Sequence, residues 1–276
     1  MTTWSAINAA YSAVFNLWFE LLAALSPWLQ VLITALPVTV LALLVFRYAS
    51  NQNGIRLAKE RIKAYLLELW LYKDDLGVML RAQGQVLQYS LRYLGLSLVP
   101  MAVMIVPLGP AIVQLESQFA FRSIQPGETT IFTVSMDTDK PVSALDVTLL
   151  LPAGVVEETS ALRIDKTGQL LWRLRVDEPG QHDITVTVGD QRVSRRLLAG
   201  ADMYGLWPQV FNAADWRVLG SAAEPSLPAG TAVISTEIDY LRARGEFLGL
   251  SSASWLLLLF TLLLGLVLRG LFGVTF

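Results

Sequence analysis

Cysteine is absent from the chain, and histidine occurs once, at His182. Without thiols the protein can form neither a disulfide nor a thiolate site, so we expect its folded parts to be stabilised by packing alone. His182 follows Pro179, Gly180 and Gln181 at the predicted start of a strand, where we expect a turn residue rather than a metal ligand or a base. Only a carboxylate-rich metal site stays open.

Sequence motifs of catalysis are also missing. The chain has no glycine-rich phosphate loop, no nucleophile elbow and no zinc-ligand spacing. Adjacent carboxylates occur at Asp74 and Asp75 and at Glu157 and Glu158, but both pairs lie in predicted loops, where solvated turns explain them better than a shared substrate does. The sequence therefore predicts a protein that is not an enzyme and that carries no cofactor or metal.

Charged residues are scarce, at 16% of 276 residues against 54% hydrophobic ones. A helix needs about 20 consecutive apolar residues to cross the hydrocarbon core of a bilayer. Three uncharged stretches are long enough: 21–46, 93–115 and 247–268. We interpret them as three transmembrane helices. No charged residue lies inside them, which argues against a proton- or ion-coupled transporter.

Charge is distributed unevenly between the two connections that separate these spans. Residues 47–92 hold eight Lys or Arg and four Asp or Glu, a net +4, whereas residues 116–246 hold 12 and 18, a net −6. Basic short loops stay in the cytoplasm, which places the N-terminus outside and the C-terminus, after Arg269, inside. Neither a basic start nor a cleavage site precedes the first span, so we expect a multi-pass protein of the cell inner membrane that retains it.

Residues 1–20 have the periodicity of an amphipathic helix. Polar residues recur every three or four positions, at Ser5, Asn8, Ser12, Asn16 and Glu20, and aromatic and aliphatic residues fill the other faces. We interpret this segment as a helix in the outer membrane interface. Two alternatives remain open: the helix extends the first span, or it packs on the protein.

Residues 47–92 predict a cytoplasmic helical hairpin. Helical spacing over 55–71 is followed by a turn at Lys73 to Asp75 and resumes over 76–91. Arg56, Lys59 and Lys63 form a basic face that could contact anionic lipid, ribosomal RNA or an acidic segment, or could simply be solvated.

The first two predicted spans contain proline. Pro27 and Pro37 stand in the first, and Pro100, Pro107 and Pro110 in the second. Proline removes a backbone hydrogen bond and kinks a helix, and in lipid the freed carbonyl needs another partner. We expect the second span to pack on its neighbours or to border a hydrated cleft, unless the membrane helix merely tolerates its prolines.

After residue 116 the pattern changes to the alternation of β-strands. Five short segments, 130–136, 144–151, 169–176, 182–188 and 192–198, are separated by turn residues. The spacing predicts an extracytoplasmic immunoglobulin-like sandwich over 116–200 with Trp172 in its core and a tight hairpin at 188–192. We interpret residues 201–246 as a connecting segment, in which 233–238 could add a strand.

The order of the first 120 residues resembles the core of the YidC/Oxa superfamily of membrane-protein insertases, in its three-span form. The resemblance rests on Val14 to Leu22 before the first span, on Arg56 to Lys63 in the hairpin, and on Leu98 to Met101 and Met104 to Pro107 in the second span. It implies a hydrophilic groove open to cytoplasm and lipid, and a hairpin that receives the client. The groove arginine that bacterial members carry within the first span has only Arg47 as its counterpart, and bacterial members have five core spans.

Uncharged polar residues within the spans could line such a groove. They are Thr34, Thr39, Ser97 and Gln114, with Arg47 at the inner end of the first span. Ordinary hydrogen bonding between membrane helices is the alternative explanation.

Two functions are compatible with these patterns as hypotheses. The first is an insertase-like or chaperone-like factor for membrane-protein biogenesis, whose partners are the bilayer and nascent or newly inserted membrane proteins. The second is a structural or assembly subunit of a cell-envelope complex that docks other envelope proteins through the β-sandwich. Neither hypothesis involves DNA.

Overall fold

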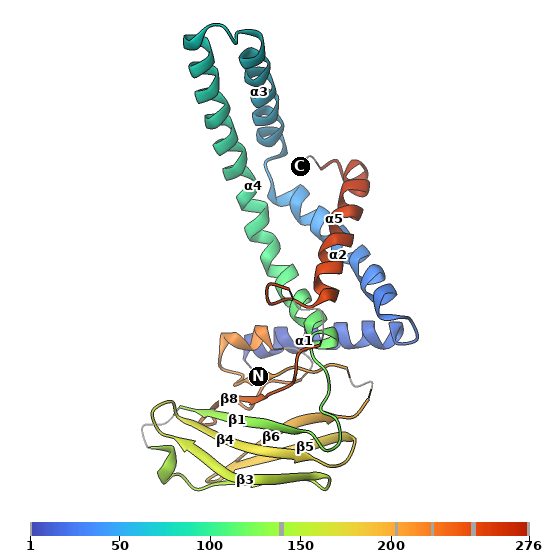
Figure 1. Cartoon of the computed structure of the whole chain (residues 1–276), viewed down its shortest axis with the longest axis vertical. Helices are drawn as coiled ribbons and strands as arrows, with labels where there is room; N and C mark the ends of the chain where they lie inside the picture. The colour runs from blue at the N-terminus through green and yellow to red at the C-terminus, as the bar shows by residue number, and fades with distance from the viewer. Residues whose placement is uncertain (1, 138–140, 202–203, 222–223, 244–246, 275–276) are drawn as a thin grey trace. The chain divides into compact units, whose positions relative to one another are not determined.

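The computed structural model describes residues 2–137, 141–201, 204–221, 224–243 and 247–274, apart from the side chains of residues 106, 107 and 110. The chain divides into two compact units. One comprises Met1–Gln30 and Pro110–Trp255, and the other comprises Val31–Gly109 and Leu256–Phe276. The first contains the β-strands, and the second is helical (Figure 1).

The helical unit is built from most of α2 (Pro27–Ala49), α4 (Leu76–Phe119) and α5 (Ser252–Phe272) and all of α3 (Gln52–Leu71). α3 begins at the N-cap Asn51, whose side chain accepts a hydrogen bond from Gly54 N at 2.9 Å. The carboxylate of Asp75 accepts from Gly77 N and Val78 N in the first turn of α4. Asn51 thus caps the start of α3, and Asp75 caps α4 at the turn of the hairpin. The structure confirms the two helices expected over 55–71 and 76–91.

α4 is one helix of 44 residues. The sequence predicted that a hairpin helix ending near residue 91 would be followed by a separate span over 93–115, but the structure joins them without a break at 92 and 93. Pro100, Pro107 and Pro110 do not end the helix. A proline removes one hydrogen bond from the helical ladder, and the apolar residues on both sides keep their helical periodicity.

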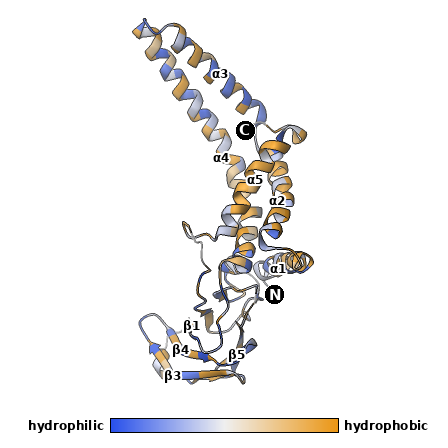
Figure 2. Ribbon diagram, turned by 45° about the vertical axis from the view of Figure 1, so that its right-hand side comes forward, coloured by the Kyte–Doolittle hydropathy of each residue, from blue (hydrophilic) through white to orange (hydrophobic). Residues whose placement is uncertain are grey.

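Among the described residues, two helices are long and apolar enough to cross a membrane: α2 and α5. They correspond to the first and third expected spans, although α2 begins at Pro27 rather than at residue 21. Only 11% of the apolar window of α5 is buried within the protein, and Figure 2 shows the helix coloured as hydrophobic along its length. A helix that is apolar on its exposed faces is typical of a membrane segment. The second expected span, 93–115, lies within α4 and stays a prediction, because residues 106, 107 and 110 lie outside the described side chains.

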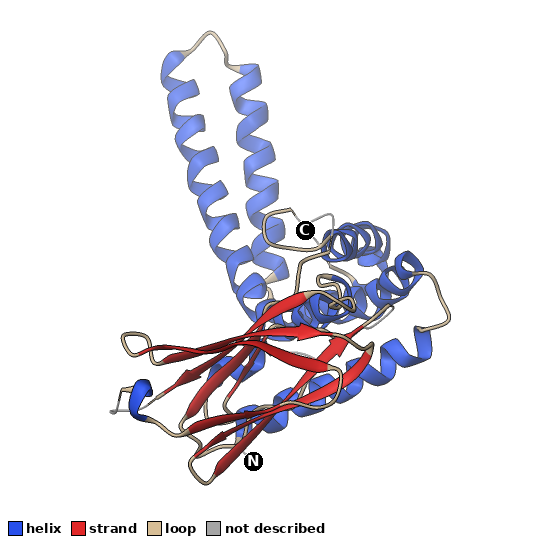
Figure 3. Ribbon diagram, turned by 60° about the horizontal axis from the view of Figure 1, so that its bottom comes forward, coloured by secondary structure: helices blue, strands red, loops and turns tan. Residues whose placement is uncertain are grey.

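In the part of the other unit that the structure describes, eight strands form two antiparallel sheets (Figure 3). The sheet orders are β3-β4-β1-β8-β7 and β2-β5-β6. Its strands are β1 (Thr129–Met136), β2 (Val147–Leu150), β3 (Val155–Ile164), β4 (Gln169–Val176), β5 (Gly180–Val188), β6 (Gln191–Ala199), β7 (Gln209–Phe211) and β8 (Val233–Ile238). The structure thus confirms strands in all five expected segments and in 233–238.

Two strands, β3 and β7, were not expected from the sequence. β3 alternates poorly because it is an edge strand with most of its side chains exposed, and its pairing with β4 is interrupted by two register shifts. β7 has only three residues. Together with β8 it places two parts of the expected connecting segment, residues 209–211 and 233–238, in the five-stranded sheet.

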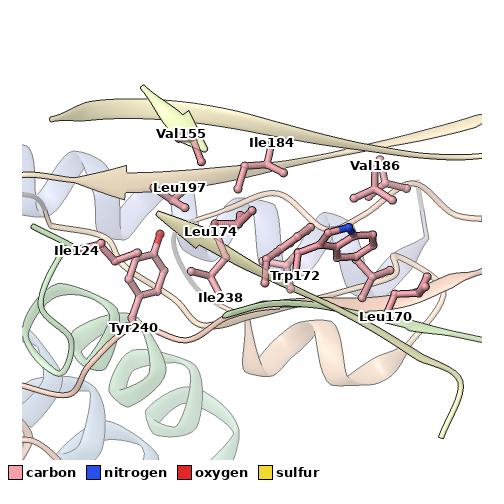
Figure 4. Close-up of a cluster of buried hydrophobic side chains, with 14 of the residues drawn as sticks. Ile124, Val155, Leu170, Trp172, Leu174, Ile184, Val186, Leu197, Ile238 and Tyr240 are labelled. Carbon is pink, nitrogen blue, oxygen red and sulfur yellow. The ribbon is translucent and has the colours of Figure 1, made fainter. Parts of the chain in front are cut away.

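One hydrophobic core lies between the two sheets. It contains side chains from β1, β3, β4, β5, β6 and β8, and Figure 4 shows Leu170, Trp172, Leu174, Ile184 and Val186 facing one another. Trp172 is 3% exposed, and its ring stacks on Phe132 with 5.9 Å between centroids. This confirms Trp172 as a core residue.

The tight hairpin expected at 188–192 is also present. Two residues, Gly189 and Asp190, join β5 to β6. Gly189 has φ 56°, a conformation that suits glycine and the primed turns of two-residue hairpins.

Candidate membrane-interface site

The N-terminal helix α1 (Thr3–Leu22) has an unusual distribution of polar residues. Its polar stripe is buried: Ser5 and Asn8 are 4% exposed and Ser12 is 8% exposed. Its apolar residues face outward, with Val14 66% and Leu21 73% exposed. This is the reverse of an amphipathic helix on a protein in water, whose apolar stripe faces the core.

The buried stripe of α1 contacts the β-containing unit. The Thr2 hydroxyl caps the helix, accepting from Ser5 N at 3.3 Å, and also donates to the Ala213 carbonyl. Gln114 Nε2, near the end of α4, donates to Ser12 Oγ at 2.8 Å. α1 also lies against the short helix η2 (Trp216–Gly220). The polar stripe thereby finds protein partners, and the apolar face is left without protein cover.

Aromatic side chains extend this contact along α1. The Phe19 ring meets the Phe119 ring of α4 edge to face, with centroids 5.9 Å apart. Trp4 remains 45% exposed on the uncovered face, together with Ile7 and Leu17. Trp beside aliphatic residues is typical of surfaces at the level of lipid head groups.

Glu116 is a buried carboxylate that no sequence pattern singled out. Its Oε1 accepts hydrogen bonds from Ser251 N at 3.0 Å, from Ser251 Oγ at 2.8 Å and from the Ser254 hydroxyl. Ser251 precedes α5, and its hydroxyl in turn accepts from Ser254 N. A carboxylate is favourable at the N-terminus of a helix, where free N–H groups and the helix dipole meet it. The Ser-rich stretch before the Leu run is the sequence signal of this cap.

The candidate groove residues are divided between the two units. Thr34, Thr39, Ser97 and Arg47 belong to the helical unit and Gln114 to the other. Thr34 and Thr39 are buried, Ser97 is half-buried and Arg47 is exposed. The Thr39 hydroxyl donates to the Ala35 carbonyl one turn earlier at 2.6 Å. Thr39 is thus satisfied within its own helix, and the Gln114 amide donates to Ser12 of α1.

The three basic residues of the hairpin do not share one environment. Arg56 and Lys63 are exposed. Lys59 is half-buried, and its Nζ lies 5.6 Å from the centroid of the Tyr93 ring of α4. A cation over an aromatic face is held mainly by the ring quadrupole. Two of the three cations are therefore exposed on the surface, and Lys59 fastens α3 to α4.

The turn of the hairpin exposes large apolar side chains to which the sequence patterns assigned no role. Leu67, Trp70 and Leu71 at the end of α3 and Leu76 and Leu80 at the start of α4 are 64% to 77% exposed. Exposed apolar clusters of this kind mark surfaces that contact other proteins or lipid. The signal was present in the sequence as the run Leu66-Leu67-Glu68-Leu69-Trp70-Leu71.

Within the described residues, no group of three or more His, Asp or Glu side chains is placed to hold a metal ion. His182 is buried, and its Nε2 lies 2.9 Å from the Glu178 carbonyl at the turn before β5. It lies within β5 rather than in a turn, and its ring bonds the carbonyl of the turn that precedes the strand.

Comparison with known proteins identifies no family for the chain. No family model matches it, and no curated protein matches it. Among solved structures, domains 4 and 5 of the S-layer protein SbsC are similar, at 15% identity and a TM-score of 0.24, over 30% of this chain. The chain covers 48% of that structure, about half its length.

Proposed function

We propose that this protein is a non-enzymatic, insertase-like or chaperone-like factor of membrane-protein biogenesis, similar to three-span members of the YidC/Oxa superfamily. In this proposal α2, residues 93–115 of α4, and α5 cross the cell inner membrane. The N-terminus and the β domain lie outside, and the α3–α4 hairpin and the C-terminus lie in the cytoplasm.

The continuity of α4 is the observation that carries the proposal. At 1.5 Å per residue, residues 93–115 extend about 35 Å, enough for a hydrocarbon core of about 30 Å. Residues 76–92 add about 25 Å to the same helix. A hairpin arm that continues without a break into a membrane helix can transmit a contact at its tip to the membrane, which a flexible loop cannot do.

The surface of the hairpin suits a segment that is partly apolar and partly charged. Trp70 and its leucine neighbours offer apolar contact at the tip, and Arg56 and Lys63 offer exposed positive charge along α3. An unfolded membrane protein presents both apolar spans and charged flanks, and a non-catalytic factor binds such segments by contact alone.

The arrangement of α1 supports a position in the outer interface. Its uncovered apolar face would contact acyl chains while its polar stripe stays bound to protein. The short connection of residues 23–26 then leads directly into α2, which is apolar enough to cross the bilayer.

Strand order supports an immunoglobulin-like sandwich for the outer domain. In the constant-type fold, strands D, E and B are neighbours in one sheet and C, F and G in the other. Naming β1 to β6 as B to G gives β3-β4-β1 and β2-β5-β6, which are these two orders. β8 pairs antiparallel to β1 in the place that strand A holds in that fold. Trp172 departs from the pattern, because it lies on the strand equivalent to E rather than C.

Depletion of the protein, followed by quantitative proteomics of the cell envelope, tests this function. We expect a subset of other integral membrane proteins to decrease and to recover when the wild-type protein is expressed again. If the levels of all membrane proteins remain unchanged, the proposal is wrong.

A matched pair of variants tests the role of the hairpin. Arg56→Glu combined with Lys63→Glu reverses two exposed charges on α3, and Arg192→Glu changes an exposed arginine on β6. We expect the hairpin variant to accumulate in the membrane without restoring the client proteins, and the β6 variant to restore them. Equal restoration by both variants would exclude the basic face as a client contact.

The alternative function, a structural or assembly subunit of an envelope complex, is favoured by one observation. β3 is an open edge of the five-stranded sheet and exposes Val156 and Leu162, at 42% and 60%. An open edge can pair with a strand of another protein. Affinity purification in mild detergent distinguishes the two functions: fixed partners in constant ratio favour the assembly role, and ribosomes or nascent chains favour the insertase role.

A further inference from the structure

A polar cavity lies in the β-containing unit beside α1. Its volume is about 300 Å³, and it is lined from three directions, by the second half of α1, by the end of α4 and by β6 with the residues after that strand. Four polar side chains of this lining are placed to bind a ligand: Asn16 and Glu20 of α1, Gln118 of α4 and Arg196 of β6. The cavity is therefore formed where the interfacial helix meets the β domain.

Arg196 has an unsatisfied donor in this lining. Its Nε is buried and has no hydrogen-bond partner among the described residues. Asp183 is its cross-strand neighbour on β5, but the two form no ion pair within 4.0 Å. The adjacent Arg195 also has a buried Nε without a hydrogen-bond partner, but its guanidinium is paired with Glu224 at 2.5 Å. Arg196 lines the cavity and has no ion-pair partner among the described residues, so its positive charge favours an anion there.

Glu20 gives the same cavity a negative charge. It is exposed at the end of α1, and no hydrogen bond or ion pair of its carboxylate occurs within the described part of the chain. Arg196 and Glu20 line one cavity without pairing to each other. An opposite pair of charges held apart by a polar space matches a ligand that carries both signs. A simple anion would be repelled by Glu20, and a simple cation by Arg196.

The size and the surroundings of the cavity indicate which zwitterion it takes. About 300 Å³ is at the lower end of ligand cavities, which suits a head group and leaves no room for acyl chains. Phe19 lines the same cavity, and the outward face of α1 is apolar. A molecule with its polar end in the cavity could therefore lay its chains along α1.

We propose that this cavity binds the head group of phosphatidylethanolamine, with the phosphate on Arg196 and the primary ammonium on Glu20. The amides of Asn16 and Gln118 complete the hydrogen bonding of the head group. A primary ammonium has three N–H donors for a carboxylate and amide oxygens, whereas a quaternary ammonium has none and is bound by aromatic cages. The site fixes α1 to the outer leaflet, and it depends on the interfacial placement of α1 under the proposed function.

Binding to the purified full chain in detergent tests the proposal, with native mass spectrometry as the readout. The probes are dihexanoyl phosphatidylethanolamine and the matched phosphatidylcholine and phosphatidylglycerol, and free phosphoethanolamine. We expect the ethanolamine lipid to bind about tenfold more tightly than the other two lipids, since one charge-assisted hydrogen bond corresponds to about this factor. Free phosphoethanolamine should bind more weakly than the lipid, because it lacks the chains.

Two variants assign the charges. Arg196→Gln should weaken binding of the ethanolamine lipid about tenfold or more, and Glu20→Gln should remove the preference over phosphatidylglycerol. Arg192→Gln, an exposed arginine on the same strand that does not line the cavity, is the control and should bind like the wild type. Circular dichroism and the thermal transition of each variant establish that it is folded.

Several outcomes would overturn the proposal. Unchanged binding by folded Arg196→Gln would exclude the phosphate contact, and equal binding of phosphatidylcholine would exclude the ammonium contact. Equally tight binding of free phosphoethanolamine would show a site for a soluble compound rather than a lipid. None of these results depends on client proteins, so failure here is distinguishable from failure of the depletion experiment.

Discussion

The ion pair between Arg195 and Glu224 offers a sharp test of how the β domain is held together. Arg195 is 1% exposed on β6, and its Nη1 lies 2.5 Å from Glu224 Oε2, with the two side chains 1% and 9% exposed. Its Nη2 donates to the carbonyls of Trp207 and Pro208. One guanidinium thus fastens two parts of the segment after β6 to the sheet. The perturbation is Glu224→Gln, which keeps the shape of the side chain and removes its charge.

The magnitude follows from the burial of the pair. Removal of one partner leaves the other charge buried without compensation, which costs about 3–5 kcal/mol. Glu224→Gln keeps one acceptor for Arg195, so we expect the lower end, about 3 kcal/mol. The free energy of unfolding of a domain is about 5–15 kcal/mol, so the variant should fold but should be markedly weakened. The exposed pair of Arg175 and Asp177, with side chains 41% and 42% exposed, should contribute far less, because solvent screens it.

Pulse proteolysis of the full chain in detergent, across a series of urea concentrations, measures this difference. With a urea dependence of about 2 kcal/mol per molar, Glu224→Gln should lower the unfolding midpoint of the β domain by about 1.5 M. Asp177→Asn, the matched carboxylate-to-amide change in the exposed pair, should lower it by less than about 0.5 M. If the two variants shift the midpoint equally, the buried pair does not hold the segment 201–224, and the reasoning is refuted.

Three further predictions concern other parts of the chain. Because cysteine is absent, single-cysteine variants report topology directly: Asp190→Cys should react with an impermeant maleimide in spheroplasts, and Asp74→Cys only after permeabilisation, whereas the opposite pattern would invert the proposed orientation. Burial raises the pKa of Tyr240 to about 12, so the folded state keeps this proton more tightly than the unfolded state, and stability should be lost as the pH rises from 10 towards 12. The loss is about 1.4 kcal/mol at pH 11, and Tyr240→Phe should lose none of it in urea unfolding at pH 9 and 11. Ser12→Ala removes the partner of the buried Gln114 amide and should lower the free energy of unfolding by about 1–3 kcal/mol, whereas an exposed Ala13→Ser change on the same helix should be neutral in the same assay.

The sequence predicted most helices and strands because their local signals agree with their environment. β4 and β5 alternate cleanly, since one face of each is packed in the core around Trp172. β3 was missed because an exposed edge strand has no need to alternate. The structure also joins the expected hairpin helix and the expected span 93–115 in one helix. Arg92 is the last charged residue before the expected span. A helix can pass from a polar to an apolar surrounding without interrupting its backbone hydrogen bonds, and α4 continues through Arg92.

The candidate site was harder to predict because it depends on pairing between distant segments. Arg196 and Glu20 are 176 positions apart (196 − 20) in sequence, and nothing local marks either as part of a cavity. In the sequence, Glu116 was only the first charged residue after an expected span. In the structure, its carboxylate accepts hydrogen bonds from Ser251 and Ser254, which come much later in the chain. By contrast, the polar residues that the sequence did single out within the spans, such as Thr39, include ones satisfied within their own helix.

In the N-terminal helix α1, the pattern of polar and apolar residues does not by itself show which face contacts protein and which contacts the surroundings. The stripe of Ser5, Asn8 and Ser12 would fit a water-facing surface equally well, but hydrogen bonds and burial place it against protein. The apolar face of α1 is therefore the exposed one. Burial of a large apolar side chain contributes about 1.5–3 kcal/mol, so half-exposed Trp4, Ile7 and Leu17 with their neighbours Val14 and Leu21 would leave about 5 kcal/mol unrealised in water. That amount is comparable with the stability of a small domain. Contact of this face with an apolar phase would therefore stabilise α1 as it is folded here, as the proposed interfacial position requires.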